Sequence, residues 1–199
     1  MKPAKTEVSI FLIVISILFM FSKSSAQTRF GLSAGLNGST IKKVFNGESG
    51  TGKYKLGIQA GLFLEIGILD YWAIQPELNY TQLGAKFEDV DGNNFTSDIT
   101  FITMPILAKL RLMEFGFYAG PQVGYVFQAS DRYTGGTVDM TDYYRKVNLS
   151  GVVGAEYVFR EHLVSSVRYQ LSITDLSKDT EFGPSLKNTA FTFTLGYKF

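Results

Sequence analysis

The 199-residue chain contains no cysteine and only one histidine. Without cysteine it has no disulfide, no thiolate metal site and no cysteine nucleophile. Its formal net charge is +1, so the surplus of basic residues that is typical of nucleic-acid binding is missing. No Walker, Rossmann or zinc-ligand spacing occurs either. We therefore expect no cofactor, no bound metal and no nucleic-acid partner.

Long apolar runs are scarce, and the single one lies at the N-terminus. Val8–Phe21 is apolar except for two serines, and it follows a start that carries two lysines. Ser24-Ser25-Ala26 then offers the small residues that a signal peptidase reads. A transmembrane helix is the alternative, but the run is shorter than the roughly 20 residues that cross a bilayer. We predict a signal peptide at 1–26 and an outer-membrane barrel domain at 27–199.

The rest of the chain shows a regular alternation of apolar and polar residues. Every second residue is apolar from Leu56 to Ile66, and again from Phe191 to Phe199. A period of two indicates extended strands with two chemically different faces. No helical period occurs in this part of the chain. Strands are predicted at 29–38, 53–66, 70–87, 96–113, 115–128, 145–160, 162–173 and 188–199.

The connections between these strands alternate between long and short. Tight turns are expected around Ile68, Glu114 and Glu161, so all long loops would lie at one end of the sheet. Outer-membrane barrels show this asymmetry, with short periplasmic turns and longer external loops. The predicted fold is therefore all-β, an eight-stranded antiparallel up-and-down transmembrane β-barrel in the cell outer membrane. The long loops are predicted at 39–52, 88–95, 129–144 and 174–187.

A soluble lipocalin-like carrier would show the same alternation with the apolar stripe inside. Three features favour the membrane barrel instead. Aromatic residues such as Trp72 and Tyr80 fall near strand ends, as in interfacial belts. The strands reach the roughly 9–11 residues that cross hydrocarbon at a tilt. The last strand also runs to Phe199 without a tail. The expected surroundings are outer-membrane lipid and lipopolysaccharide.

Several segments resemble the outer-membrane β-barrel domain family, and in particular its PorT-like members. They are IQPELNY at 74–80, MPILAK at 104–109 and YAGPQVG at 118–124. The resemblance spans about 29–199 and implies a barrel. For PorT it implies a role in protein secretion across the outer membrane. It also implies that the barrel assembly machinery recognises the last strand through Phe191, Phe193, Leu195, Tyr197 and Phe199.

The polar stripe carries three acidic and three basic residues. An eight-stranded barrel has an interior just wide enough for side chains to fill, and unpaired charge there is costly. We therefore predict a plugged lumen held by salt bridges, with a small gated pore or proton path as the alternative. The residues of this predicted network are Glu65, Glu77, Lys109, Arg111, Glu156 and Arg168.

The long loops hold the remaining candidate site. Tyr133, Tyr143 and Tyr144 lie among acidic residues, a composition that suits binding of a protein, a glycan or calcium. Solvated loops above an aromatic belt are the alternative. No catalytic residue is expected. His162 falls at a predicted periplasmic turn, and no serine nucleophile lies at the outer leaflet to use it as a base. The predicted function is structural or partner-binding, with PorT-like secretion or transport and a lipocalin-like carrier as alternatives.

Overall fold

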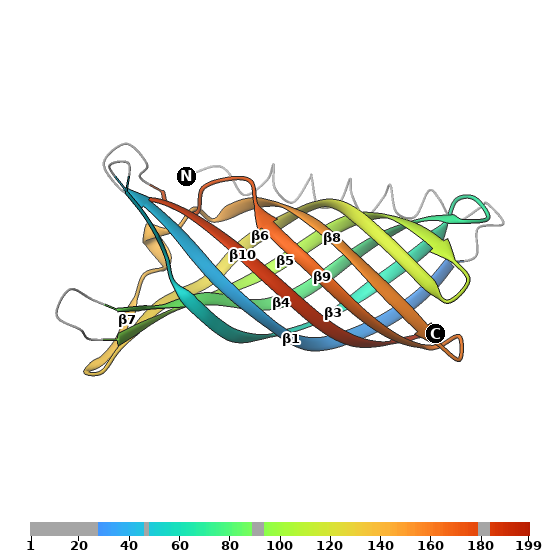
Figure 1. Cartoon of the computed structure of the whole chain (residues 1–199), viewed down its shortest axis with the longest axis horizontal. Coiled ribbons are helices and arrows are strands. Elements are labelled where there is room, and N and C mark those ends of the chain that lie inside the picture. The colour runs from blue at the N-terminus through green and yellow to red at the C-terminus, as the bar shows by residue number, and fades with distance from the viewer. Residues whose placement is uncertain (1–27, 46–47, 89–93, 179–183) are drawn as a thin grey trace, which may run out of the picture.

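The computed structural model describes residues 28–45, 48–88, 94–178 and 184–199, which form one closed antiparallel β-barrel (Figure 1). Eight long strands form the ring, and pairing of the last strand with the first closes it. They are β1 (Thr28–Phe45), β3 (Lys53–Gly67), β4 (Trp72–Glu88), β5 (Asn94–Leu112), β6 (Phe115–Tyr133), β8 (Val147–Phe159), β9 (Leu163–Ser172) and β10 (Ser185–Lys198).

All eight predicted strands are present, each paired with its neighbours in the chain, as the up-and-down prediction requires. The predicted N-terminal signal peptide lies outside the described residues. No helix in the described ranges is long and apolar enough to span a membrane. The closed ring of eight antiparallel strands confirms the predicted barrel fold.

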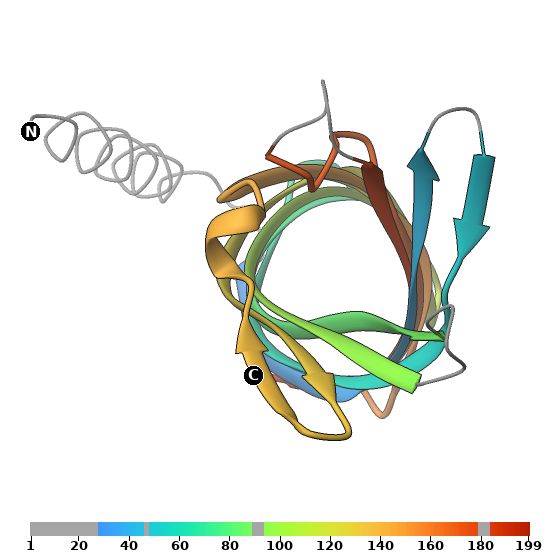
Figure 2. The same cartoon turned by 90° about the vertical axis from the view of Figure 1, so that its left-hand side faces the viewer.

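Two of the predicted long loops are wrong in their extent. Residues 39–45 continue β1, and residues 42–45 pair with the short strand β2 (Glu48–Thr51). In the same way β6 continues to Tyr133 and pairs with β7 (Gly136–Asp139), before a single 3-10 turn, η1 (Thr141–Tyr143). Continuing the ladder gives hydrogen-bond partners to backbone groups that the ring has left unpaired. Figure 2 shows these two hairpins projecting from the loop end on different sides of the ring.

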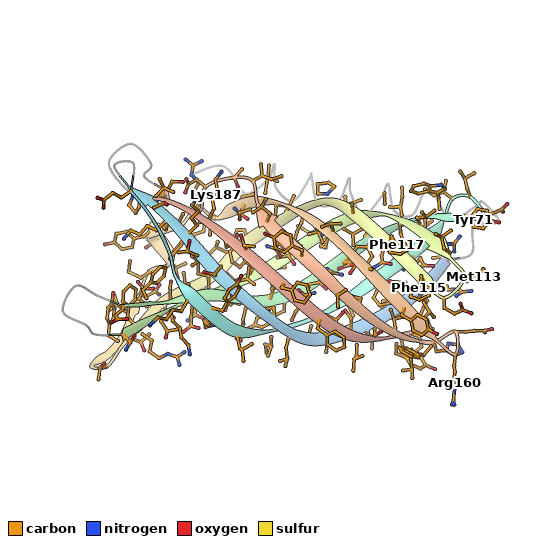
Figure 3. All side chains as sticks on the ribbon, in the orientation of Figure 1. Tyr71, Met113, Phe115, Phe117, Arg160 and Lys187 are labelled. Carbon is orange, nitrogen blue, oxygen red and sulfur yellow. The ribbon has the colours of Figure 1, made fainter. Side chains whose placement is uncertain are left out.

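The outer wall carries the apolar stripe. On β5 the outward side chains are apolar from Leu112 to Ile102, and Thr100 and Asp98 then take their place. This length suits a strand that crosses hydrocarbon. Figure 3 shows side chains standing outward along the whole wall, with Met113 and Arg160 at one end and Lys187 towards the other. A soluble carrier requires the opposite arrangement, so the lipocalin-like alternative is wrong.

At the end of the barrel with tight turns, the strands are connected through residues in left-handed backbone conformations. Arg160 and Glu161 have φ values of 48° and 68°, and the amide of His162 donates to the carbonyl of Phe159. Two consecutive positive φ angles are typical of the type I′ turn, whose twist matches that of the flanking strands. Short turns face the periplasm in outer-membrane barrels, so the end with the long loops faces the cell exterior.

Candidate functional site: the filled lumen and the external mouth

The half of the lumen nearest the tight turns is filled by a buried charge network. The Lys109 ammonium lies 2.6 Å from one oxygen of Glu65 and also contacts Glu156. Lys198 lies 2.8 Å from the same Glu65 oxygen, and Arg111 lies 3.4 Å from the other. A carboxylate held by three cations is well compensated for its removal from water.

A second group lies beside the first and is centred on a two-pronged ion pair. Arg168 donates to both oxygens of Glu77, at 2.8 and 3.0 Å. Planar pairing of this kind is the strongest arrangement between arginine and a carboxylate. Gln75 links the two groups, because its amide donates to Glu77 at 2.8 Å and its carbonyl accepts from Lys109 at 2.8 Å. The Arg168 guanidinium also lies 5.4 Å from the centre of the Tyr118 ring.

The structure therefore brings all six residues of the predicted lumen network together. It adds Lys198 of the terminal strand, which is not among the six predicted residues. Lys198 keeps the phase of Thr192 and Thr194, whose side chains also point inward. Its spacing of an even number of residues from these threonines is the feature of the sequence that predicts an inward side chain. With Lys198 included, the described network holds four basic and three acidic side chains.

The half of the lumen nearest the loops, which we call the apolar half, contains an apolar cluster beside buried polar side chains such as Asn37, Ser97 and Asn188. The prediction of a polar lumen therefore misses this apolar cluster. Its buried side chains come from β1, β4, β5, β6 and β10, together with two loop residues. We call them the apolar plug: Ile41, Leu83, Ala85, Ile99, Phe101, Val126, Ala129, Tyr144, Leu176 and Ala190.

A β-bulge on β6 accounts for part of this change. Phe101 pairs with Val126 and Thr100 pairs with Gln128, which leaves Phe127 as an extra residue. Phe127 and Gln128 therefore both lie on the outside, and the next inward side chain is Ala129. A bulge shifts the alternation by one residue, so apolar Ala129 points inward where polar Gln128 would otherwise have done so.

Two external segments are bonded to each other over the apolar plug. Leu176 is 0% exposed, and its amide donates to the carbonyl of Leu186 while its carbonyl accepts from the amide of Arg145. Arg145 Nε also donates to the carbonyl of Ser177 at 2.8 Å, and the amide of Lys178 donates to the carbonyl of Tyr143. These bonds hold the segment 143–145 against 176–178, and we call the pair the external cap.

The three tyrosines predicted as an interaction site do not lie together on the surface. Tyr143 is 68% exposed, and Tyr133 is exposed beside Phe95, with ring centres 5.3 Å apart. Tyr144 is only 8% exposed, because its ring packs into the apolar plug and its hydroxyl lies 3.3 Å from that of Ser97. Its placement in an exposed site was wrong, since the backbone bridge to Ser177 turns the side chain inward.

The terminal strand lies at the seam where the barrel closes. Phe191, Phe193, Leu195, Tyr197 and Phe199 all point outward. The Phe199 amide donates to the carbonyl of Phe30, and the two rings stack with centres 5.8 Å apart. The strand thus offers an apolar outer edge next to β1. The role of this strand in assembly stays a prediction from the resemblance.

The described residues contain no group of three acidic or histidine side chains that could hold a metal ion. His162 lies at the end with tight turns, where its Nδ1 is 2.9 Å from the carbonyl oxygen of Lys198 and its ring stacks on Tyr197. These contacts tie the β8–β9 turn to the end of β10. That location agrees with the turn position expected for His162.

Comparisons with known proteins decide the family. Residues 22–178 match the family described as outer membrane protein beta-barrel domain. The chain belongs to this family. The match covers most of the chain, and it places the protein in the cell outer membrane with lipid around its wall. It does not separate PorT-like members from the others.

Solved structures of small outer-membrane barrels share the fold of this family member. Neisserial surface protein A is 13% identical with a TM-score of 0.58, over 85% of this chain and 97% of that one. The attachment invasion locus protein Ail of Yersinia pestis is 17% identical with a TM-score of 0.55, over 86% and 98%. Ail has also been crystallised with the heparin analogue sucrose octasulfate. No curated protein sequence matches the chain.

Proposed function

We propose that this outer-membrane protein is a non-conducting barrel that anchors the external cap and the two external hairpins for binding a partner outside the cell. The observation that carries the proposal is the double filling of the lumen. A charge network occupies one half and the apolar plug occupies the other. Neither half resembles the water-filled interior of a large porin.

The two fillings oppose ion flow in different ways. In the charged half, the cavity beside Glu77 and Arg168 measures about 20 Å³, which is room for about one water molecule. In the apolar half, Phe101 and Leu176 exclude water, and hydrophobic constrictions of this kind block ions by dewetting. An ion would have to break the network and wet the plug during a single passage.

Conductance in a planar bilayer tests this part of the proposal. The purified protein should give no current steps, while a large porin added to the same bilayer gives them. A Leu176→Gly variant, which removes one plug residue, should stay silent because the charge network still fills the other half. Regular current steps from the wild-type protein would overturn the proposal of a closed barrel.

The binding part of the proposal rests on the external cap. Its backbone bonds hold Tyr143 in an exposed position, and loops on a rigid barrel are the usual place for binding. A photoreactive residue at Tyr143 should crosslink in intact cells to a discrete partner. The same residue at Met113, exposed in a tight turn at the other end, serves as the matched control. Identical crosslinks from both positions would contradict a partner at the external end.

A PorT-like role in secretion is the second candidate, and the sequence resemblance is what favours it. The filled lumen leaves no room for a polypeptide, so such a role would act through the surface of the barrel. Deleting the gene and comparing the secreted proteins tests it, and an unchanged set of secreted proteins would defeat it. We propose no catalytic activity for either candidate.

A further inference from the structure

We propose that the external mouth of the barrel is a binding site for a small apolar molecule that carries a protonated amine. Asp131 would be the partner of the amine. The inference needs neither the closed lumen nor the protein partner proposed above, because it rests on a separate cavity and on one buried carboxylate.

The cavity lies on the outer side of the apolar plug. It measures about 510 Å³, which is within the roughly 300–1,000 Å³ of small-molecule sites. Most of its accessible lining is apolar, and it lies in the mouth of a β-barrel, where such sites commonly occur. Its apolar walls are formed by Ile41, Phe87, Phe95, Met140, Tyr144 and Leu186.

Asp131 is the unusual group in this cavity. The residue is 8% exposed, and it lies on β6 directly across from Ser97 of β5. Within the described part of the chain, its Oδ1 is buried and has no hydrogen-bond partner. A buried acceptor without a donor costs free energy, and more so when it belongs to a carboxylate. The Asp131 side chain lines the cavity, so an ammonium group bound there would compensate the charge of the buried carboxylate.

The buried charge in the cavity favours an amine over an anion. Lys43 of β1, Lys178 of the external cap and Asp142 of η1 line the same cavity, but all three side chains are exposed to solvent. The two lysines and one aspartate leave the rim with a net charge of +1, which water screens because all three side chains are exposed. Asp131 is the only buried charged group in the described lining, so the deep end of the cavity is acidic.

The walls suit the rest of such a molecule. Phe87 and Phe95 stack with ring centres 5.3 Å apart, and the buried ring of Tyr144 lines the same cavity. Aromatic faces take up apolar groups and also attract ammonium ions. A metal ion is a poor alternative occupant, because the described residues supply no cluster of three ligands here.

Binding of phenethylamine to the full-length barrel in a zwitterionic detergent tests the proposal, measured by calorimetry. Phenethylamine should bind, and the anion 3-phenylpropionate, of similar size, should bind at least about tenfold more weakly. Asp131→Asn should weaken phenethylamine binding by about tenfold or more, because it removes the charge and keeps the shape. Asp142→Asn removes an equal charge from the rim, and binding should stay within about twofold.

Three results would overturn the inference. They are no binding of phenethylamine, equal binding of the amine and the anion, and equal effects of the two asparagine variants. The last result would mean that only the general charge of the mouth matters. The shift in gel mobility between unboiled and boiled samples shows that each variant is folded. Partition of the amine into detergent micelles is the same for all variants, so it cancels in the comparison.

Discussion

The two halves of the lumen are held by different interactions, salt bridges in one and an apolar cluster in the other. Near the tight turns, Glu65 and Glu77 are buried with lysine and arginine partners at salt-bridge distance. Near the loops, Phe101 and Leu176 pack with other apolar side chains and need no partner. The comparison teaches that one closed barrel can be filled in two ways, which differ in how well they tolerate substitutions. A charge network depends on every partner, whereas an apolar cluster depends mainly on volume.

The largest effect is expected from breaking the charge network. Arg168→Met leaves the buried Glu77 carboxylate without its cation, so we expect a loss of about 3–5 kcal/mol in unfolding free energy. Urea unfolding in detergent, followed by gel mobility, measures it. The double variant Glu77→Gln with Arg168→Met should recover much of the loss. An equal loss in the single and double variants would show that the pair itself is unimportant.

An arginine should behave differently on the outer, lipid-facing side of the wall. Ile106 is 55% exposed and points towards lipid, so Ile106→Arg should cost about 2–4 kcal/mol. Unfolding in lipid vesicles measures this cost. Ile106→Val is the control and should cost far less. Arginine tolerated at position 106 as well as it is at 168 would remove the distinction between the lumen and the lipid face.

A smaller effect is expected in the apolar plug. Leu83→Met keeps the volume of a buried side chain, so the cost should be below about 1.5 kcal/mol. Leu83→Asn, of similar size but polar, provides the contrast and should cost clearly more. The same urea titration serves for both variants. A methionine variant as damaged as Arg168→Met would contradict the greater tolerance of the apolar half.

The smallest effect is expected when the external cap is exposed to low pH. Burial raises the pKa of Asp175, but hydrogen bonds from the Ser185 side chain and from the Leu186 and Ser177 amides outweigh it and lower the pKa. Because the pKa is lowered, ionised Asp175 stabilises the cap at pH values above about 4, the ordinary pKa of aspartic acid. This stabilisation is lost as the pH falls through the pKa of the folded state. Hydrogen exchange at Leu186, corrected for intrinsic rates, should therefore rise in acid. Asp175→Asn should abolish the pH dependence, and a wild-type rate that does not change with pH would refute it.

Much of the fold could be predicted because alternation is a local signal. The strand containing Gln59 and Glu65 shows which face is polar without any knowledge of its neighbours. The six charged residues of the network follow from the same phase. The pairing of Arg168 with Glu77 could not be predicted, because the two residues lie on strands that are not adjacent in the sheet.

The apolar plug was missed for a different reason. On β5 the inward residues Ile99 and Phe101 are apolar while the outward residues Asp98 and Thr100 are polar, so the alternation is reversed relative to the rest of the strand. The bulge at Phe127 then shifts the phase of β6, and no residue type near it marks the shift. Tyr144 was placed on the surface because its inward turn depends on a backbone bridge to a distant segment.

Single-cysteine labelling tests the filled lumen most directly, since the native chain has no cysteine to interfere. Cysteine would replace Ser166 in the charged half, Val126 in the apolar half and Leu62 on the outer wall. The folded barrel in lipid vesicles should leave the first two unmodified by a charged water-soluble thiol reagent, and Leu62→Cys should react only with a lipid-soluble reagent. Rapid modification at 126 and 166 by the charged reagent would mean a hydrated, open bore and would contradict the account.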